Sequence, residues 1–304
     1  MTLEFSRDFD PAYGRLVEIA PGIRRMTVAN PSAFTFAGTN TYVVGEGRVA
    51  VIDPGPADPG HLHALRAALS GETITRILVT HTHRDHSPNA AALAAETGAA
   101  SYGAGPHRPA PGAHPVGGSG RLDAAGDTAF VPTRPVGDGE IIEGEGFRLQ
   151  AVATPGHADN HLAFALLGTD ILFSGDHVMG WATTVVAPPD GSMRDYMASL
   201  DVLLARPESR YLPGHGGAVG NAHSHLRGLK AHRRMRERAI LDRLAKGDET
   251  VPEIVAAIYR DVDPRLHGAA GLSTLAHLQD LVARGLVACG AAPDLAARYA
   301  LAPG

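Results

Sequence analysis

Short apolar runs separated by glycine and proline dominate the first two thirds of the chain. Six of them have the length and composition of strands, namely residues 23–28, 41–44, 49–52, 147–153, 162–167 and 171–173. The triplet Gly-Glu-Gly at 45–47 is typical of a hairpin turn. Apolar positions recur with helical spacing over 61–69, and residues 89–97 form an alanine-rich helical pattern. This mixture predicts an α+β fold in which two sheets pack on each other with helices outside.

The last third of the chain has a different pattern. A long helix is predicted over 219–244, a second helix begins near Val251, and a third covers 272–283. Residues 285–287 then have the character of a first wing strand. This order predicts a small winged-helix-like domain. We therefore expect a catalytic domain over 1–217 and a long helix plus winged-helix-like domain over 218–304.

Residues 103–139 do not fit either pattern. They contain repeated glycine and proline with little apolar periodicity, which predicts an extended surface loop rather than another layer. His107 and His114 lie in this segment and are expected to face solvent. A loop of this length can nevertheless border a functional site.

Composition narrows the classes of protein that are possible. The chain has 304 residues, 44% of them hydrophobic, which suits one large and one small domain. A net charge of -5 gives no general attraction to nucleic acid or to an anionic membrane. The single cysteine, Cys289, permits no intrachain disulfide. Neither a signal peptide core within residues 1–15 nor a bilayer-spanning apolar run is present, so a cytoplasmic location is expected.

The densest chemistry follows the apolar run 77–79. Here His81, His83, Asp85 and His86 fall within six residues, and imidazole and carboxylate are good ligands for zinc or a similar divalent ion. The segment is therefore interpreted as half of a two-metal site. Three further candidates each end a short apolar run beside a glycine: His157, Asp176 and His215.

The ordered motifs HxHxDH, TPGH, SGD and PGHG resemble those of the metallo-β-lactamase superfamily, and residues 20–217 can be aligned with its pattern. This resemblance implies an αββα sandwich and a dinuclear site. It assigns one metal ion to His81, His83 and His157, and the other to Asp85, His86 and His215. Asp176 would bridge the two ions.

The appended domain narrows the resemblance further. Together with the motifs at 30–32, 38–42 and 195–200, it is similar to the lactamase-beta-2-like branch, whose best studied animal relative is an endoribonuclease that prefers single strands. The chain departs from that branch at 87–89, Ser-Pro-Asn, where a glycine pair usually follows the metal motif. It departs again in the longer 103–139 segment. Both departures lie on the substrate side.

The implied chemistry is hydrolysis by a hydroxide that bridges two divalent ions, because such ions lower the pKa of bound water to roughly 7. Zinc is expected, although manganese or iron would also suit these donors. No G-x-S-x-G motif occurs, so Ser87 and Ser174 are interpreted as structural. Asp85 could orient the water but is expected to be a ligand. His161 could support a ligand or donate a proton to the leaving group, and support is favoured.

The substrate stays open between a phosphodiester of single-stranded RNA and a small acyl thioester or lactone. Duplex DNA is disfavoured because the predicted third helix lacks lysine and carries arginine only after its end. The sequence gives no oligomeric state. A third possibility, from another class, is an iron-containing redox protein, but no glycine-rich flavin loop follows residue 217.

An arginine cluster over 227–238 is the remaining basic feature. Arg233 with Glu237, and Arg238 with Asp242, have the spacing of helical ion pairs, which favours an ordinary solvated helix. The functional alternative is that His232, Arg233 or Arg236 holds a phosphate or carboxylate of the substrate.

Overall fold

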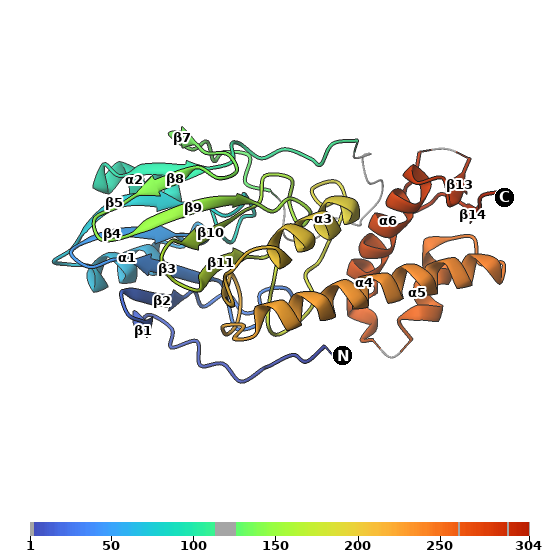
Figure 1. Cartoon of the computed structure of the whole chain (residues 1–304), viewed down its shortest axis with the longest axis horizontal. Helices are drawn as coiled ribbons and strands as arrows, with labels where there is room; N and C mark the ends of the chain where they lie inside the picture. The colour runs from blue at the N-terminus through green and yellow to red at the C-terminus, as the bar shows by residue number, and fades with distance from the viewer. Residues whose placement is uncertain (1–2, 113–125, 261, 291, 304) are drawn as a thin grey trace.

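The computed structural model describes residues 3–112, 126–260, 262–290 and 292–303. In this part of the chain two sheets lie face to face and helices cover both outer faces (Figure 1). The first sheet contains, in spatial order, β1 (Val17–Ala20), β2 (Ile23–Thr27), β3 (Asn40–Val44), β4 (Arg48–Ile52), β5 (Thr73–Leu78), β6 (Ala100–Gly103) and β7 (Arg134–Pro135). The second contains β12 (Arg210–Pro213), β11 (Ile171–Gly175), β10 (Leu162–Leu166), β9 (Arg148–Ala153) and β8 (Ile141–Glu143).

Both sheets are mixed. The strands β1 to β4 pair antiparallel, whereas β4 to β7 pair parallel, and the predicted hairpin turn joins β3 to β4. In the second sheet only β11 and β12 pair parallel. The strand prediction is therefore confirmed for β2, β3, β4, β9, β10 and β11 within a residue or two. The sequence patterns for β1, β6, β7 and β8 were too short to be recognised.

Alternating side chains of the central strands are buried on both faces, which explains their continuous hydrophobic character. In β3, Tyr42 and Val44 point into the core between the sheets, while Val43 points to the outer helices. In β10, Phe164 joins the same inner core, and Ala163 faces the other way. Small residues on that outer face leave room for helices to approach.

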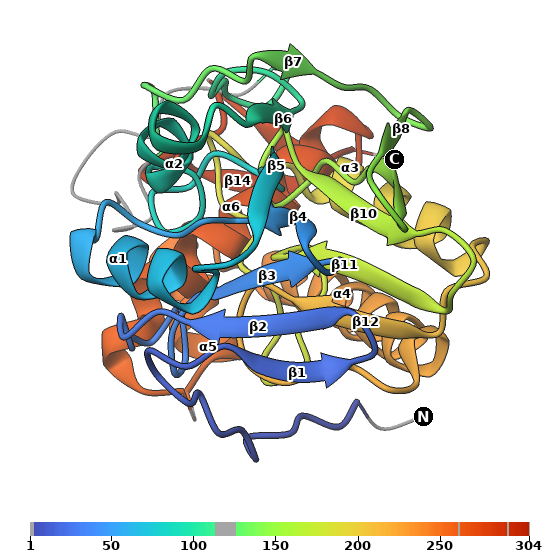
Figure 2. The same ribbon diagram turned by 90° about the vertical axis from the view of Figure 1, so that its left-hand side faces the viewer.

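Helices cover each outer face of the sandwich (Figure 2). On the first sheet these are α1 (Pro59–Ala68) and α2 (Asn89–Thr97), which bury leucines against the strands. On the second they are α3 (Met193–Leu204) and the first half of α4 (Ala222–Ala245). Side chains of Asp58 and Ser192 cap the N-termini of α1 and α3. This arrangement confirms the predicted αββα sandwich.

The C-terminal elements are α5 (Val251–Ile258), the 3₁₀ turn η1 (Pro264–Leu266), α6 (His267–Ala283), β13 (Val287–Cys289) and β14 (Tyr299–Leu301). They form their own hydrophobic core with the last turns of α4, including Ile240 and Leu244. A capping box between Thr250 and Glu253 starts α5. Helix α6 begins five residues before the predicted start. The two strands pair antiparallel as a wing.

Helix α4 belongs to both cores. Leu226 and Leu229 pack with the second sheet and α3, whereas Ile240 and Leu244 pack with α5 and α6. The helix therefore joins the two domains rigidly, and a boundary at 217/218 stays a prediction. None of the helices in the described part of the chain has the length and hydropathy needed to cross a bilayer.

Among its described residues, the 103–139 segment is not simply a surface loop, and this prediction is wrong at Phe130 and at 134–135. Strand β7 adds to the edge of the first sheet, and Phe130 is buried in the core under α1 and α2. The short strand escaped recognition because it contributes only two residues, one of them a proline. His114 lies outside the described residues.

Candidate metal centre

The histidine- and aspartate-bearing motifs all follow the last residue of a strand. The turn from His81 to His86 comes after β5, and His157 comes shortly after β9. Asp176 directly follows β11, and His215 comes two residues after β12. The strand ends therefore deliver all of these side chains to one edge of the sandwich.

Three imidazoles converge at the first half of the centre. His83 Nδ1 lies 3.0 Å from His81 Nε2 and 3.0 Å from His157 Nε2. All three side chains are buried or nearly so. Three ring nitrogens at this separation can hold one divalent ion, as the resemblance implied.

The second half contains Asp85, His86 and His215. Asp85 Oδ2 lies 3.2 Å from His86 Nε2 and 3.3 Å from His215 Nε2. Asp176 lies between the two halves, with its Oδ2 3.1 Å from His215 Nε2 and 3.7 Å from His157 Nε2. The structure thus brings together all seven predicted ligands, with Asp176 in the bridging place. Their function as ligands stays a prediction.

Each of the five histidines has its outward-facing ring nitrogen occupied. The outer partners are Thr80 Oγ1 for His81 at 3.0 Å, Asp190 Oδ2 for His83 at 3.4 Å, Asp53 Oδ2 for His86 at 3.0 Å, Val185 O for His157 at 2.7 Å and Gly38 O for His215 at 3.2 Å. In a neutral imidazole, an oxygen acceptor on the outer side favours the proton on the outer ring nitrogen. The inner nitrogen can then present its lone pair to a metal ion.

The polar atoms at the centre are suited to a cation. His86 Nε2 and Asp176 Oδ1 are buried and have no hydrogen-bond partner among the described residues. Burial would lower the pKa of His215, but Asp176 and Asp85 outweigh this and raise it to about 10. By contrast, burial, followed by the charges of His86 and His83, holds the pKa of His81 well below its usual value. The carboxylates therefore attract positive charge, and this fits the donor set of a dinuclear site.

His161 is fully enclosed behind the centre. Its Nε2 accepts a hydrogen bond from the backbone N–H of Asp176 at 3.2 Å, and its Nδ1 lies 2.8 Å from Thr154 Oγ1. Burial is the first cause that holds the pKa of His161 well below its usual value. Because both ring nitrogens of His161 are engaged by buried partners, this geometry favours support of Asp176 over proton donation to a leaving group.

Sequence reasoning missed Asp53, which follows β4 and adopts a positive φ of 51°. This buried carboxylate accepts hydrogen bonds from the Thr80 backbone N–H and hydroxyl, each at 2.7 Å, as well as facing His86. It thereby orients two histidines of the centre. Its position directly after an apolar strand, in Asp53-Pro54-Gly55, is the signal that could have identified it.

The expectation that His107 faces solvent is wrong. Its side chain is 14% exposed, and its Nδ1 lies 3.0 Å from the Thr82 hydroxyl. The two serines near the centre are structural, as predicted. Ser87 donates to Asp127 Oδ2 at 2.7 Å, and Ser174 donates to the Val178 carbonyl at 2.8 Å.

The arginine cluster is not an ordinary solvated helix. Arg233 is only 4% exposed, donates to the Thr184 carbonyl and lies with Cζ 5.2 Å from the Tyr196 ring centre. Glu237 pairs with Arg284 at 3.0 Å, so the predicted pairing with Arg233 is wrong. The helix periodicity could not show this, because the burying surface comes from α3 and α6.

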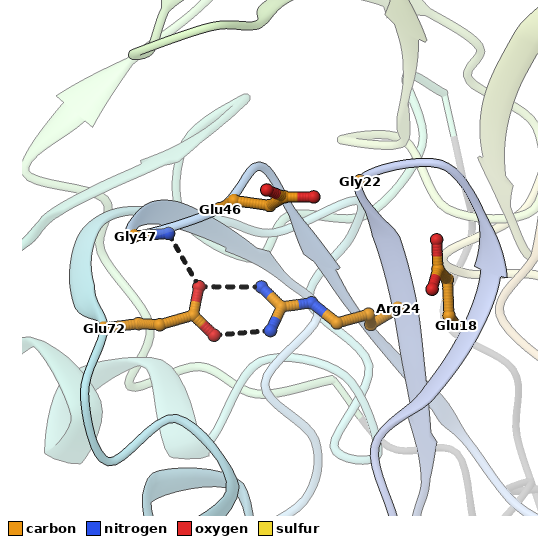
Figure 3. Close-up of a pocket in the computed structure, with 6 residues that line it drawn as sticks. All are labelled: Glu18, Gly22, Arg24, Glu46, Gly47 and Glu72. Atoms are coloured by element: carbon orange, nitrogen blue, oxygen red, sulfur yellow. Dashed lines mark hydrogen bonds and ion pairs between the residues drawn. The ribbon is translucent and has the colours of Figure 1, made fainter.

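A surface pocket of about 290 Å³ lies away from the metal centre, at the turns beside β1 to β5 (Figure 3). Arg24 and Glu72 form a two-pronged ion pair there, and Glu72 also accepts from the Gly47 backbone N–H at 2.9 Å. The Arg24 hydrogen bond is the main cause that lowers the pKa of Glu72. The ion pair between Arg24 and Glu72 ties two turns together at this pocket.

Comparison with known proteins agrees with this geometry. Residues 34–215 match the metallo-β-lactamase superfamily, and residues 250–292 match the β-lactamase-associated winged helix domain. The chain is 30% identical to a β-lactamase-like protein 2 homolog of Drosophila melanogaster, covering 90% of this chain and 91% of that protein. It is also 29% identical to an atrochrysone carboxyl ACP thioesterase of Aspergillus novofumigatus, covering 90% and 81%.

A solved metallo-β-lactamase family protein of Thermus thermophilus superimposes with a TM-score of 0.72 at 25% identity, over 93% of this chain and 100% of that chain. A β-lactamase domain protein of Burkholderia ambifaria reaches 0.79 at 22% identity, over 99% and 97%. The chain therefore belongs to the metallo-β-lactamase superfamily. It is a hydrolase of this fold, with histidine and aspartate clusters consistent with a dinuclear metal site.

Proposed function

We propose that this protein is a zinc-dependent thioesterase that hydrolyses a small or carrier-linked acyl thioester. The observation that carries the hydrolytic part is the pair of three-residue clusters that meet at Asp176, with one ring nitrogen of each histidine directed at the centre. Two zinc ions, when bound, would supply a nucleophilic hydroxide at neutral pH and stabilise negative charge on the attacked carbonyl. His81, His83 and His157 would hold one ion, and the second cluster the other.

The protein's own groups maintain this geometry. The Thr39 hydroxyl donates to Asp85 Oδ2 at 3.0 Å and thereby fixes the carboxylate beside His86 and His215. The Asp176 backbone is anchored through His161. Among the described residues, Ser87 and Ser174 near the centre donate their hydroxyl hydrogens to Asp127 and to the Val178 carbonyl, so neither is placed to attack. The residues thus orient donors and neutralise charge, and no covalent acyl-enzyme is required.

The position of α6 in the appended domain argues against duplex DNA as a partner. In a DNA-reading winged helix the third helix presents side chains to the groove. In α6 the residues from Gly271 to Leu278 are all buried, and Ala276 packs into the core around α3. Arg194 of α3 also pairs with Asp280 of α6 at 3.2 Å. This face is therefore occupied by the catalytic domain, which disfavours duplex DNA as a partner.

Similarity to named thioesterases adds to this argument. A second atrochrysone carboxyl ACP thioesterase, from a Cryptosporiopsis species, is 26% identical over 80% of this chain. Attack on a thioester carbonyl needs one activated water and stabilisation of one oxyanion, which a dinuclear centre provides. The acyl group itself is not specified by these contacts.

The alternative candidate is hydrolysis of single-stranded RNA. It is favoured by the resemblance of the chain to the lactamase-beta-2-like branch and by two exposed arginines of α4, Arg234 and Arg238, which could contact a phosphate backbone. Under this alternative the same centre would activate water for attack at phosphorus.

One panel separates these candidates. Zinc-loaded protein is given an S-acyl N-acetylcysteamine thioester, an acylated carrier protein, a γ-lactone and end-labelled single-stranded RNA, with thiol release and gel analysis as readouts. Thioester turnover that disappears in Asp176→Asn and persists in Asp201→Asn supports the proposal. Asp201 serves as the control because it is an exposed residue of α3 that pairs with Lys230. RNA cleavage without thioester turnover would favour the alternative. Redox-active iron in the purified protein would overturn the zinc assignment.

A further inference from the structure

We infer that Asp190 is a positioning residue for the metal-facing histidine His83, and that His107 holds Asp190 in place. This role would make the start of the 103–139 segment part of the support of the metal centre. The inference rests on His83 being a ligand, as in the proposed function, but not on the identity of the substrate.

Asp190 lies in the connection between β11 and α3, and its side chain is 17% exposed. Its two oxygens contact different histidines. Oδ2 lies 3.4 Å from His83 Nε2, and Oδ1 lies 3.4 Å from His107 Nε2. A carboxylate with two acceptor oxygens can receive both ring protons at once, which a neutral amide cannot do.

The neighbouring groups determine which atom donates and which accepts in each hydrogen bond that leads to Asp190. Asn160 Nδ2 donates to the Thr82 hydroxyl at 2.8 Å, so that hydroxyl is free to donate onward. Its next partner, at 3.0 Å, is His107 Nδ1. His107 then carries its proton on Nε2 and presents it to Asp190. Every donor meets an acceptor with both histidines neutral, as ligand chemistry at His83 requires.

His83 is the one histidine of the five that faces the centre through Nδ1; the other four face it through Nε2. An imidazole that coordinates through Nδ1 directs Nε2 away from the metal ion and towards the cavity wall. A rigid acceptor at that point sets the ring orientation and raises the basicity of the inner nitrogen. Asp190 is the described side chain that provides such an acceptor.

Two described parts of the segment are bonded to the chain next to this network. Ala110 N donates to the Pro189 carbonyl at 2.8 Å, next to Asp190, and Asp127 N donates to the Thr82 carbonyl at 2.6 Å. Gly126 has no side chain because the His107 ring occupies that space. A Cβ there would lie 2.1 Å from His107 Cε1. The close approach of this glycine thus fixes the imidazole against Asp190.

The test measures metal binding by the full-length protein, with no substrate. Zinc affinity is determined by competition with a chromophoric chelator, and the Co(II)-substituted protein is examined by absorption spectroscopy. Asp190→Ala is expected to lower metal affinity about 10- to 100-fold and to change the Co(II) bands. Asp190→Glu should restore much of the affinity. His107→Phe and Gly126→Ala should each give a smaller loss in the same direction.

Arg108→Ala is the matched control, because Arg108 also ties the segment to the domain, through Asp159, but contacts none of the seven candidate ligands. It is expected to leave metal affinity unchanged. Equal losses in Arg108→Ala and His107→Phe would overturn the inference, since loop anchoring would then explain both. Wild-type affinity and spectrum in Asp190→Ala would also overturn it. Neither readout depends on thioester turnover, so failure of the proposed substrate is distinguishable.

Discussion

Two groups of buried histidines lie close together in this fold and have opposite surroundings. In the metal centre all five histidines have an outer partner and an inner nitrogen directed at neighbouring donors. The second group, here called the interdomain group, consists of His177, Tyr196, Arg233, Thr274 and His277. Among the described residues, neither His177 nor His277 has a hydrogen-bond partner for either ring nitrogen.

The charges around the two groups explain their different behaviour. Carboxylates raise the pKa of His86 and His215 against the effect of burial. In the interdomain group burial comes first, and the charge of Arg233 adds to it, so the pKa of His277 falls to about 3. Burial, together with the charges of His157 and Arg233, also lowers the pKa of His177 to about 3. The same residue type therefore attracts a cation in one place and stays neutral beside a fixed cation in the other.

The largest expected effect is at the carboxylate between the two clusters. Asp176→Asn removes one negative charge and one acceptor from a site that already attracts positive charge. We expect loss of metal, measured by elemental analysis, and loss of turnover greater than the 10- to 100-fold typical of outer-sphere changes. The exposed variant Asp201→Asn serves as the control. Full metal content with wild-type turnover in Asp176→Asn would contradict the bridging assignment.

The sequence predicted the metal centre more completely than its surroundings. Ligand motifs are local, since each places one or a few donors directly after a strand, so His81, His83 and Asp176 could be read along the chain. Their supports are not local. Asp53 and Asp190 reach the centre from separate connections. Asp53 at least follows an apolar strand, but nothing in the immediate sequence of Asp190 distinguishes it from a turn residue.

The same contrast applies to the fold. Central strands such as β3 and β10 were predicted because both faces are buried and the pattern is strongly apolar. Edge strand β7 was not predicted because it has only two residues. Helix α4 was interpreted as solvated because its sequence is polar, although Arg233 is buried under α3 and α6. Burial by another domain is a property of the tertiary structure, which helical spacing alone does not encode.

The second prediction concerns pH and the metal centre. In the metal-free protein Asp176 and Asp85 raise the pKa of His215 to about 10, so this ring is protonated at neutral pH, and neighbouring carboxylates also raise the pKa of His86. Ligands must be neutral, so metal binding has to release the His215 proton, and affinity should fall tenfold or more per pH unit as pH is lowered from 8 to 6. Calorimetry in buffers of different ionisation enthalpy counts the protons released. Binding without proton release would contradict the electrostatic contrast.

The third prediction uses a close contact instead of a charge. A Cβ on Gly214 would lie 2.3 Å from Asp176 Oδ1 and 2.7 Å from His86 Cε1. Gly214→Ala should therefore displace both side chains and lower metal affinity about 10-fold or more, as displaced supports do. Gly220→Ala is the matched control because nothing lies within 4 Å of its added methyl group. Equal affinities for the two variants in chelator competition would show that the centre tolerates such displacement.

The smallest effect is expected in the interdomain group and only at acidic pH. His277 has a folded-state pKa of about 3, against about 6.5 in an unfolded chain, so the unfolded state binds the proton first. Stability should therefore be lost as pH falls below 6.5, by about 2 kcal/mol at pH 5. Urea unfolding of chelator-treated protein at pH 7, 6 and 5 measures this. His277→Gln should flatten the dependence by that amount, whereas His63→Gln, at an exposed position on α1, should not. If His277→Gln kept the wild-type slope, the pKa of the ring would be the same in the folded and the unfolded protein, and burial beside Arg233 would not keep the ring neutral.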